Sequence, residues 1–367
     1  MQPLNIGMTG FASPGGSGVL AGELGRHLAR RGHCVHFIAD APPFRFPQFA
    51  DLVRYHPVKV PDYPPIRHLY TLALAARMAE VSRRFALDIL HVHYALPHTA
   101  AALLARSILG NPQRPRLITT LHGTDVTLVG SDPSLYEATS LCIRASHAVT
   151  TVSQFMKKTA TTHFPGGPHM DVIPNFVDCA ASREQRLEAA QELLLVHLSN
   201  FRSVKRPVDT VRILAAVNTV RPARLLLIGD GPQMPSVLSE MERLGLRDRV
   251  RRVGNQMDVQ TLLSPCDVFL LPSEAEGFGL AALEAMACGV PAVTSDAGAL
   301  PELIENGQGG YTVAVGDIDA MAARVLDIAA DPATLELQRA AARARAARFD
   351  AEIIVPLYED LYTRTLA

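Results

Sequence analysis

The sequence predicts an α/β protein of two doubly wound domains, each with a mostly parallel sheet between layers of helices. The first observation is length, because 367 residues exceed the roughly 250–300 residues at which one hydrophobic core stops growing. The second is that short apolar, β-branched runs alternate with longer amphipathic segments. The third is that this alternation forms two series, separated by the Pro-, Asn- and Asp-containing stretch 173–183.

The first series supplies the elements of an N-terminal domain. Its apolar runs predict strands, and amphipathic stretches such as 18–31 and 70–85 predict the helices between them. The candidate strands are residues 4–9, 35–39, 89–93, 117–121 and 148–152. The segment 41–65 is rich in proline and aromatic residues, so we expect an extended excursion there.

The second series supplies a C-terminal domain. Its candidate strands are residues 193–198, 225–228, 250–253, 268–271 and 292–294. The stretch 331–367 is Ala- and Arg-rich and predicts helix, in which Pro356 marks a kink or a new start. We place the two domains at 1–177 and 178–354, and expect residues 355–367 to pack back on the first.

The composition argues against several classes of protein. Formal net charge is -1, without a long run of like charge, so no electrostatic footprint for nucleic acid is present. The N-terminus has no secretory signal pattern, and no apolar run approaches the roughly 20 residues that span a bilayer. We expect a cytoplasmic protein without a membrane partner.

The cysteines carry no pattern of their own. They are odd in number, scattered and without a C-x-x-C pair, which predicts reduced structural thiols rather than a disulfide framework or a zinc site. The residues are Cys34, Cys142, Cys179, Cys266 and Cys288.

A glycine-rich loop follows the first predicted strand and opens a helix. In Pro14-Gly15-Gly16-Ser17-Gly18, the backbone can approach an anionic ligand at the helix N-terminus. The same residues fit a dinucleotide fingerprint, with Asp40 where the ribose-binding acid would lie, and they also fit a purely structural turn. This loop alone leaves all three interpretations open.

A cluster of cations follows the first strand of the second domain. Asn200, Arg202, Lys205 and Arg206 come directly after that strand, at the sheet edge where open α/β folds bind ligands. Arg offers a planar fork and Lys a compact charge, which together suit a diphosphate. A solvated cationic loop is the plainer alternative. Gly231 and Gln256 follow the next two strands at the same edge.

The segment 272–291 combines two carboxylates with a glycine-rich helix start. Glu276 precedes Gly277-Phe278-Gly279, and Glu284 follows within the predicted helix. One carboxylate can meet sugar hydroxyls and the other a ribose diol. Backbone N–H groups at Phe278 and Gly279 would be free to meet a sugar or a phosphate.

Polar residues also gather at one edge of the first sheet. Thr119 and Thr120 lie near the end of one predicted strand, His122 follows it, and Tyr94 follows another strand. The nearby histidines could hold a metal, but His91 and His93 alternate with apolar residues and lack carboxylate partners, so we predict no metal site. Asp317 and Asp319 resemble a cation-binding pair but fit better as a helix cap with a first-turn acid.

The GGSG loop, the SNFRSVKR cluster, the GDGP turn and the EAEGFGLAALEAMACGVP segment together resemble retaining glycosyltransferase family 4 over nearly the whole chain. The resemblance implies GT-B architecture, in which two Rossmann-like domains face each other across a cleft. It implies an acceptor on the first domain, a UDP-sugar on the second, no metal or other cofactor, and a possible homodimer. Glu276 and Glu284 correspond to the family's E-x7-E motif.

A narrower resemblance rests on HYALPH at 93–98, LHGTDVT at 121–127 and DPSL at 132–135. These segments are similar to family members that transfer N-acetylglucosamine from UDP-N-acetylglucosamine to L-malate, the first step of bacillithiol biosynthesis. The resemblance implies catalytic roles for His122, Arg202, Lys205 and Glu276. It implies acceptor contacts by Ser17, Tyr94, Thr119 and Thr120. It implies donor contacts by Gly16, Ser17, Asn200, Arg206, Gly231, Gln256, Gly277, Phe278, Gly279 and Glu284.

Alternatives to this acceptor remain. Family 4 members share donor motifs and differ in the first domain, so a lipid-linked sugar, a polysaccharide or an inositol phosphate could take the place of malate. An NAD-dependent dehydrogenase would explain the glycine loop and Asp40 but leave the cation cluster and both glutamates without a function. A sugar-nucleotide binding module would not need the polar edge of the first domain.

Overall fold

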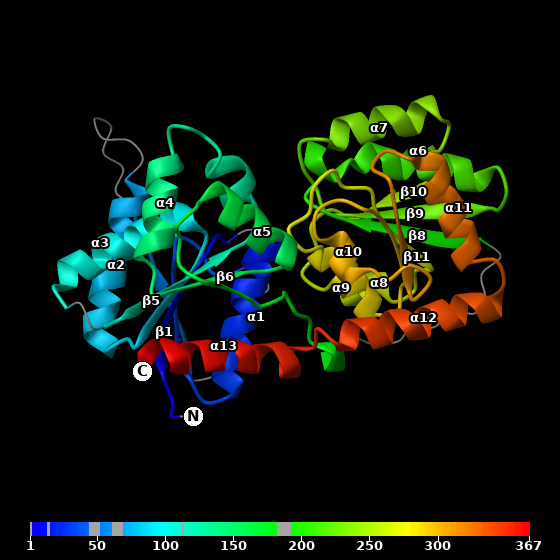
Figure 1. Ribbon diagram of the computed structural model, residues 1–367. Helices are drawn as coiled ribbons and strands as arrows, with labels where there is room; N and C mark the ends of the chain where they lie inside the picture. The colour runs from blue at the N-terminus through cyan, green and yellow to red at the C-terminus, as the bar shows by residue number, and fades with distance from the viewer. Residues whose placement is uncertain (1, 13–14, 44–51, 61–68, 112–113, 182–191) are drawn as a thin grey trace. The chain divides into compact units, whose positions relative to one another are not determined.

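A computed structural model describes residues 2–12, 15–43, 52–60, 69–111, 114–181 and 192–367 of the chain. The chain divides into two units (Figure 1). Unit 1 comprises Met1–Pro174 and Ile353–Ala367, and unit 2 comprises Asn175–Glu352. The chain passes from one unit to the other between residues 174 and 175 and between residues 352 and 353. The boundaries expected from the sequence were 177/178 and 354/355.

Unit 1 is built on a seven-stranded sheet in the order β3-β2-β1-β4-β5-β6-β7, with every neighbouring pair parallel. The strands are β1 (Asn5–Thr9), β2 (Cys34–Ala39), β3 (Val53–Pro57), β4 (Ile89–His93), β5 (Arg116–Leu121), β6 (Ala148–Thr151) and β7 (Met170–Val172). The strand order reverses between β1 and β4, as in a doubly wound fold.

Helices cover both faces of this sheet. They are α1 (Gly16–Arg30), α2 (Tyr70–Phe85), α3 (Ala100–Leu109), α4 (Tyr136–Ala145), α5 (Gln154–His163) and α13 (Ala351–Leu366). Met8 pairs with Phe37 and His91, so these side chains share one face. Both α1, through Gly25 beside Phe37, and α13, through the Tyr362 hydroxyl bonded to His91, lie on that face.

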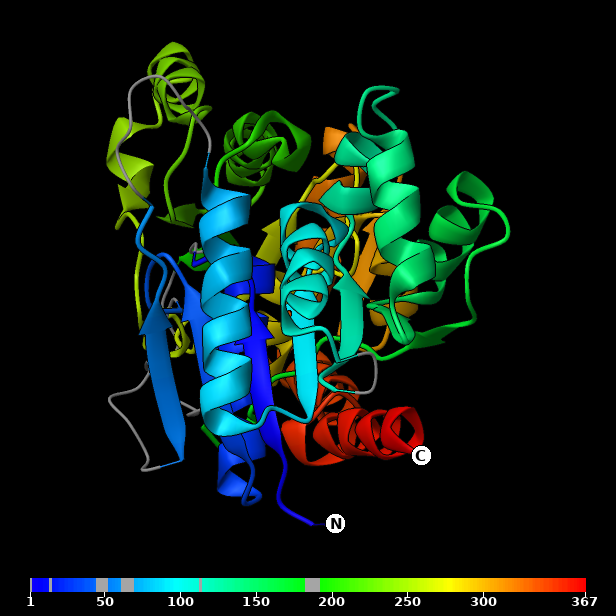
Figure 2. The same ribbon diagram turned by 90° about the vertical axis from the view of Figure 1, so that its left-hand side faces the viewer.

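The opposite face carries α2 and α3, which lie side by side in Figure 2. Their buried Leu74, Met78 and Ala101 share a hydrophobic cluster with Leu90 and Leu117 of the sheet. The side chains of successive strand residues point to opposite faces, so a strand buried on both sides reads as a continuous apolar run. In unit 1 the signal is weaker, because polar residues alternate with apolar ones in β4 (ILHVH) and interrupt β5 (RLITTL).

Unit 2 is built on a six-stranded parallel sheet in the order β10-β9-β8-β11-β12-β13. The strands are β8 (Leu193–Leu198), β9 (Ala223–Ile228), β10 (Val250–Arg252), β11 (Val268–Leu271), β12 (Ala292–Ser295) and β13 (Gly310–Val313). The helices are α6 (Pro207–Asn218), α7 (Met234–Arg243), α8 (Gln260–Leu263), α9 (Leu280–Ala287), α10 (Leu300–Leu303), α11 (Ile318–Ile328) and α12 (Pro332–Ala347). Strand order reverses here between β8 and β11.

Several expectations met a definite outcome. The prediction of two Rossmann-like parallel-sheet domains is confirmed. The predicted cap at Asp317 is confirmed, because its carboxylate accepts a 2.9 Å hydrogen bond from the Ala320 amide. All five cysteines are free thiols. None of the helices among the described residues has the length and apolarity to cross a membrane.

The excursion expected at 41–65 is corrected in part, because β3 lies within it; residues 44–51 and 61–65 lie outside the described residues. The sequence also missed β7 and β13. All three stand at an edge of their sheet, where one side of the strand makes no ladder and burial is incomplete. Their short and partly polar sequences therefore gave no periodic apolar signal.

Candidate functional site

Most of the donor residues predicted in unit 2 follow β8 and β11, the two strands between which the order of the second sheet reverses. Parallel strands open a crevice at their carboxyl ends at such a point, and ligands of open α/β folds bind there. The loop after β8 contains Lys205, and the loop after β11 contains Glu276. The topology of unit 2 therefore brings these two loops together.

The turn after β8 is held in shape by its own polar contacts. The Ser199 hydroxyl lies 2.7 Å from Nε2 of His197 and accepts a 3.1 Å hydrogen bond from the Phe201 amide. Phe201 and Arg206 both have positive φ, of 43° and 47°, a conformation that is uncommon for residues with a side chain. The buried Phe201 ring anchors the first of these bends.

Lys205 and Glu276 form the central contact of the site. The Lys205 ammonium donates a 2.6 Å hydrogen bond to Oε1 of Glu276, and the Ser273 hydroxyl donates one of 2.9 Å to the same oxygen. The two side chains are 22% and 10% exposed, so the pair is partly shielded from water and its geometry is better defined than that of a surface ion pair. It places a cation and a carboxylate within reach of one ligand.

Two glycines allow the Glu276 loop its position. A Cβ on Gly298, whose φ is +62°, would lie 2.2 Å from the Glu276 carbonyl oxygen. That oxygen instead accepts a 3.0 Å hydrogen bond from the Ala299 amide. Gly279, with φ of +99°, immediately precedes α9. Glycine is required at both positions because the backbone is left-handed and closely packed.

The other predicted donor residues surround this pair in part. Arg202 is exposed, and Glu284 is half-buried on α9. The Oδ1 atom of Asn200 is buried without a partner among the described residues. Gly231 lies against the turn, since a Cβ there would be 2.0 Å from the Asn200 carbonyl oxygen. The Phe278 ring packs on Phe349, which leaves only its backbone to face a ligand.

Two predicted donor residues are already engaged with protein groups. The Gln256 side-chain amide donates to the Val253 carbonyl. The Arg206 guanidinium is bonded to the carboxylates of Asp209 and Glu274, at 2.6 and 3.0 Å. The contact of Arg206 with a diphosphate stays a prediction.

In unit 1 the corresponding reversal of strand order lies between β1 and β4. Ser17, in the first turn of α1 beside Gly16, has its hydroxyl 2.9 Å from that of Tyr94, directly after β4. Tyr94 has φ of +83°, a strained conformation for an aromatic residue that the surrounding structure must hold in place. The ring of Phe11 packs edge-on against that of Tyr94, with centroids 5.0 Å apart.

His122 follows β5 and lies between two rings. Its Nε2 is 2.8 Å from Nδ1 of His93, and the Tyr94 ring tilts over it at 5.2 Å. Burial lowers the pKa of His122 to about 3 and that of His93 well below its usual value. Both imidazoles are therefore neutral at pH 7, so one donates and the other accepts in the bond between them.

The backbone at His122 is fixed by a buried carboxylate. Oδ1 of Asp125 accepts hydrogen bonds of 3.1 and 2.9 Å from the His122 and Gly123 amides. Burial raises the pKa of Asp125 to about 6, although these amides act in the opposite direction. Asp125 was missed by the sequence analysis; the signal was its place three residues after the histidine, which suits a carboxylate that closes a turn.

Thr119 and Thr120 lie in the interior of unit 1. Both are 0% exposed. The Thr119 hydroxyl is 2.9 Å from that of Thr99, while the Thr120 hydroxyl is 2.7 Å from Nε2 of His91. Hydroxyls buried in this way orient neighbouring groups rather than reach a ligand themselves. Their contact with an acceptor stays a prediction.

Metal ligands were considered among the same histidines. Across the described ranges, no three His, Cys, Asp or Glu side chains are arranged to hold a metal ion. The Nε2 atoms of His93 and His98 are buried without partners among those residues. The rings of His91, His93 and His122 stack in sequence, with centroids 4.8 and 5.0 Å apart.

Comparisons with known proteins cover nearly the whole chain. Residues 14–181 match the profile of glycosyltransferase family 4, and residues 179–347 match that of glycosyl transferases group 1. The chain is 42% identical over 374 residues to the N-acetyl-alpha-D-glucosaminyl L-malate synthase of Bacillus anthracis, with 98% of this chain and 96% of that protein covered. It is 28% identical over 369 residues to the glycogen synthase of Mycobacterium tuberculosis H37Rv, with 89% and 87% covered.

Solved structures share the fold. The sucrose-phosphate synthase of Thermosynechococcus elongatus superimposes with a TM-score of 0.82 at 20% identity, with 98% of each chain covered. Anabaena HepE in complex with UDP and glucose gives a TM-score of 0.80 at 20% identity, with 98% of this chain and 99% of that chain covered. The chain therefore shares the fold of these two proteins.

Proposed function

Because the chain belongs to glycosyltransferase family 4, we propose that it is a retaining glycosyltransferase that transfers N-acetylglucosamine from UDP-N-acetylglucosamine to L-malate and releases UDP. The family predicted from the sequence is confirmed by the match over both halves of the chain. The Bacillus anthracis relative, which carries this activity in its name, supports the choice of donor and acceptor. Among the three interpretations of the glycine loop, the family favours contact with a sugar substrate.

The observation that carries the proposal is the Lys205–Glu276 pair at the switch point of unit 2. A UDP-sugar has two kinds of group at its reacting end, a diphosphate and sugar hydroxyls. An ammonium matches the first and a carboxylate matches the second. Because the two side chains lie 2.6 Å apart, Lys205 can contact the diphosphate and Glu276 the sugar, on either side of the bond that breaks between them.

In the proposed reaction the malate hydroxyl oxygen bonds to C1 of the sugar as the bond from C1 to the diphosphate oxygen breaks. The attack comes from the face that the diphosphate leaves, so the configuration at C1 is retained. The hydroxyl proton passes to the departing phosphate oxygen, and no protein nucleophile is needed. The proton and the electron pair thus both end on UDP.

Stabilisation of the departing diphosphate is assigned to Arg202, Lys205 and the N-terminus of α9. Fixed cations and free backbone N–H groups aimed at developing charge are an effective form of electrostatic catalysis. We propose that these groups replace a metal ion. On the acceptor side, Ser17 and Tyr94 are assigned to contact malate, while Thr120 supports the ring stack from His91 to His122 through its bond to His91.

The test is UDP release by the purified protein from UDP-N-acetylglucosamine, measured with and without L-malate in the presence of a chelator. Malate-dependent release that survives the chelator supports both the acceptor and the metal-free mechanism. D-malate, an inositol phosphate and a glucan serve as competing acceptors, and UDP-glucose as the competing donor. Release that depends on another acceptor would replace malate and leave the family unaffected. The expected homodimer is tested by light scattering after size exclusion.

A further inference from the structure

The loops that hold Lys205 and Glu276 are joined at three consecutive points. The Glu274 amide donates a 2.8 Å hydrogen bond to the Val204 carbonyl. Next to it the Lys205 ammonium bonds Glu276, and the Arg206 guanidinium bonds Glu274 at 3.0 Å. Three adjacent residues of the loop after β8 therefore form hydrogen bonds with two residues of the loop after β11. Only the Lys205–Glu276 contact has a direct role in the proposed reaction.

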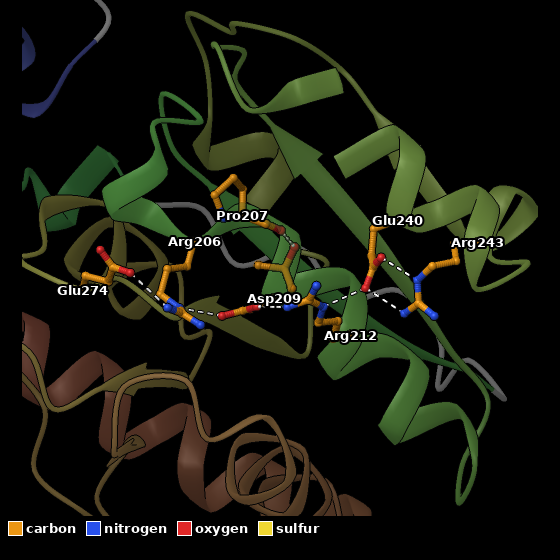
Figure 3. Close-up of polar contacts among 8 residues, drawn as sticks. Arg206, Pro207, Asp209, Arg212, Glu240, Arg243 and Glu274 are labelled. Atoms are coloured by element: carbon orange, nitrogen blue, oxygen red, sulfur yellow. Dashed lines mark hydrogen bonds and ion pairs between the residues drawn. The ribbon is translucent and has the colours of Figure 1, made fainter. Parts of the chain in front are cut away.

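Arg206 is also one member of a line of alternating charges, drawn in Figure 3. Its Nε bonds Asp209 at 2.6 Å, and Asp209 accepts a second bond of 3.1 Å from Arg212. Arg212 in turn bonds Glu240 at 2.7 Å, and Glu240 accepts from Arg243 at 2.8 Å. The line runs from the Glu274 loop over the start of α6 to α7.

The middle of this line is well defined. The Asp209 side chain is only 4% exposed and that of Glu240 is 10% exposed, so each carboxylate is shielded from water while it holds two arginines. Removing one partner of an ion pair with this burial costs more free energy than removing one partner of an exposed pair, because the remaining charge is left shielded from water. A Cβ on Gly316 would lie 3.3 Å from a terminal nitrogen of Arg206, which means that the guanidinium also rests against backbone.

The charge of Arg206 is balanced within the protein. Two carboxylates, Asp209 and Glu274, face this single guanidinium. A cation compensated on two sides has little net attraction left for a diphosphate, and a contact with phosphate would require one of the pairs to break. Arg202, which is exposed, carries no such restriction in its geometry.

We propose that Arg206 is a positioning residue rather than a diphosphate ligand: anchored by Asp209, it holds Glu274 and so fixes the turn of Lys205 against the loop of Glu276. This inference rests on the proposed transferase function for its turnover measurements. Arg212 and Glu240 support it by fixing Asp209 at the far side. Displacement of reacting groups by about 1 Å can lower a rate by up to about a hundredfold, so the bracing bears directly on turnover.

The experiment uses Glu274→Gln, because the two interpretations of Arg206 predict different effects of this change on the Kd for UDP. If Arg206 braces the loops, loss of its partner lowers kcat by about tenfold and leaves the Kd for UDP within about twofold. If Arg206 binds the diphosphate, the same change releases the guanidinium from a competing carboxylate, and UDP binds more tightly. Glu274 is 53% exposed, so its replacement leaves the fold intact.

Arg206→Ala and the double variant Arg206→Ala/Glu274→Gln complete a cycle. If Arg206 braces the loops, the two single variants lower kcat to a similar extent. The double variant is then no slower than Arg206→Ala, since both changes break the same contact between Arg206 and Glu274. Bracing also predicts that Arg206→Lys, which can meet one carboxylate, recovers part of the turnover. A diphosphate contact predicts that Arg206→Ala weakens UDP binding by about tenfold or more.

The control is Asp327→Asn, which breaks the 2.7 Å pair with Arg324 on α11. The Asp327 side chain is 51% exposed, a fraction similar to the 53% of Glu274. We expect its replacement to change neither kcat nor the Kd for UDP. Tighter UDP binding in Glu274→Gln, or kcat within twofold of the parent in both single variants, overturns the proposal. UDP affinity is measured by calorimetry without acceptor, so failure of the malate assignment is distinguished from failure of the bracing.

Discussion

The Lys205 ammonium lies 2.6 Å from the Glu276 carboxylate, across loops that are 71 residues apart in the chain. The two residues meet because β8 and β11 are neighbours in the sheet, although β9 and β10 lie between them along the sequence. The contact therefore depends on the crossover topology of unit 2. Substitution of either residue therefore also tests the role of its partner.

We expect Lys205→Ala to lower kcat by about a hundredfold or more, because removal of one preorganised donor from developing charge has effects of that size. The Kd for L-malate should change little, since malate is assigned to unit 1. Steady-state kinetics with both substrates, together with malate binding by calorimetry, measure the two effects. Lys158→Ala removes an exposed lysine of α5 and serves as the control. Turnover within twofold of the parent would remove Lys205 from the mechanism.

Glu276→Gln keeps the size of the side chain and removes its charge. We expect kcat/KM for UDP-N-acetylglucosamine to fall by roughly ten- to a hundredfold, since orientation of the sugar contributes several kcal/mol to such rates. UDP lacks the sugar hydroxyls, so its Kd should stay within about threefold. Glu242→Gln, at an exposed position of α7, is the matched change. Equal losses for UDP and for the UDP-sugar would contradict a role at the sugar.

Gly298→Ala tests whether the Glu276 loop needs its close backbone approach. The new Cβ would lie 2.2 Å from the Glu276 carbonyl oxygen, so the loop must shift and kcat should fall by about tenfold or more. Gly245→Ala is the control, because its φ of +66° is close to the +62° of Gly298 but nothing lies within 4 Å of its Cβ. The left-handed strain is thus shared, and the difference in kcat between the variants reports the contact alone.

Tyr362→Phe should lower the stability of unit 1 by about 1–3 kcal/mol, because it leaves the buried Nδ1 of His91 without its 2.8 Å partner. Tyr358→Phe is a close match on the same helix. Both residues are 0% exposed, but among the described residues the Tyr358 hydroxyl has no partner of good hydrogen-bond geometry, only a weaker polar contact with Thr120. We therefore expect Tyr358→Phe to cost less stability than Tyr362→Phe. Urea unfolding followed by circular dichroism compares them, and equal losses would count against the His91 contact.

Stability should fall as the pH is lowered through the range set by His36 and His56. Nδ1 of His36 lies 2.9 Å from Nε2 of His56, and burial lowers the pKa of each to about 4. The charged groups that act on the pair are Arg54, Arg77, Arg84 and Glu80. In the unfolded chain both rings titrate near pH 6.5, so the unfolded state takes up protons first. The stabilisation is complete above about pH 6.5 and is lost between about pH 6.5 and pH 4.

The magnitude of this loss is about 2–3 kcal/mol for each histidine. The double variant His36→Asn/His56→Gln keeps a polar pair that does not titrate, and it should flatten the difference between unfolding midpoints at pH 7 and pH 5. His169→Gln is the control, because the His169 side chain is 75% exposed. Other buried histidines remain in all variants, so the comparison with the parent is the measurement. If the difference between the unfolding midpoints at pH 7 and pH 5 is the same in the double variant as in the parent, His36 and His56 are not the source of the pH dependence.

The candidate site was largely predictable where it depends on position along the chain. Lys205 and Glu276 each follow a strand that is recognisable as an apolar run, and Tyr94 follows one in which histidines alternate with apolar residues. The carboxyl end of a parallel strand is a known place for a ligand. The partners of these residues were not predictable. Arg206 was expected at a diphosphate, whereas its guanidinium is held by Asp209 and Glu274; the choice among nearby carboxylates depends on side-chain geometry.

The sequence by itself determined the βα alternation, the division into two domains and the loops that hold the site, because these follow from local hydrophobic period and turn chemistry. Only the tertiary structure decided the edge strands β3, β7 and β13, the burial of Thr119 and Thr120, and the bond between His93 and His122. Each of these depends on which distant segments the strand order brings together. Hydrogen bonds and burial across such distances have no periodic signature in a single sequence.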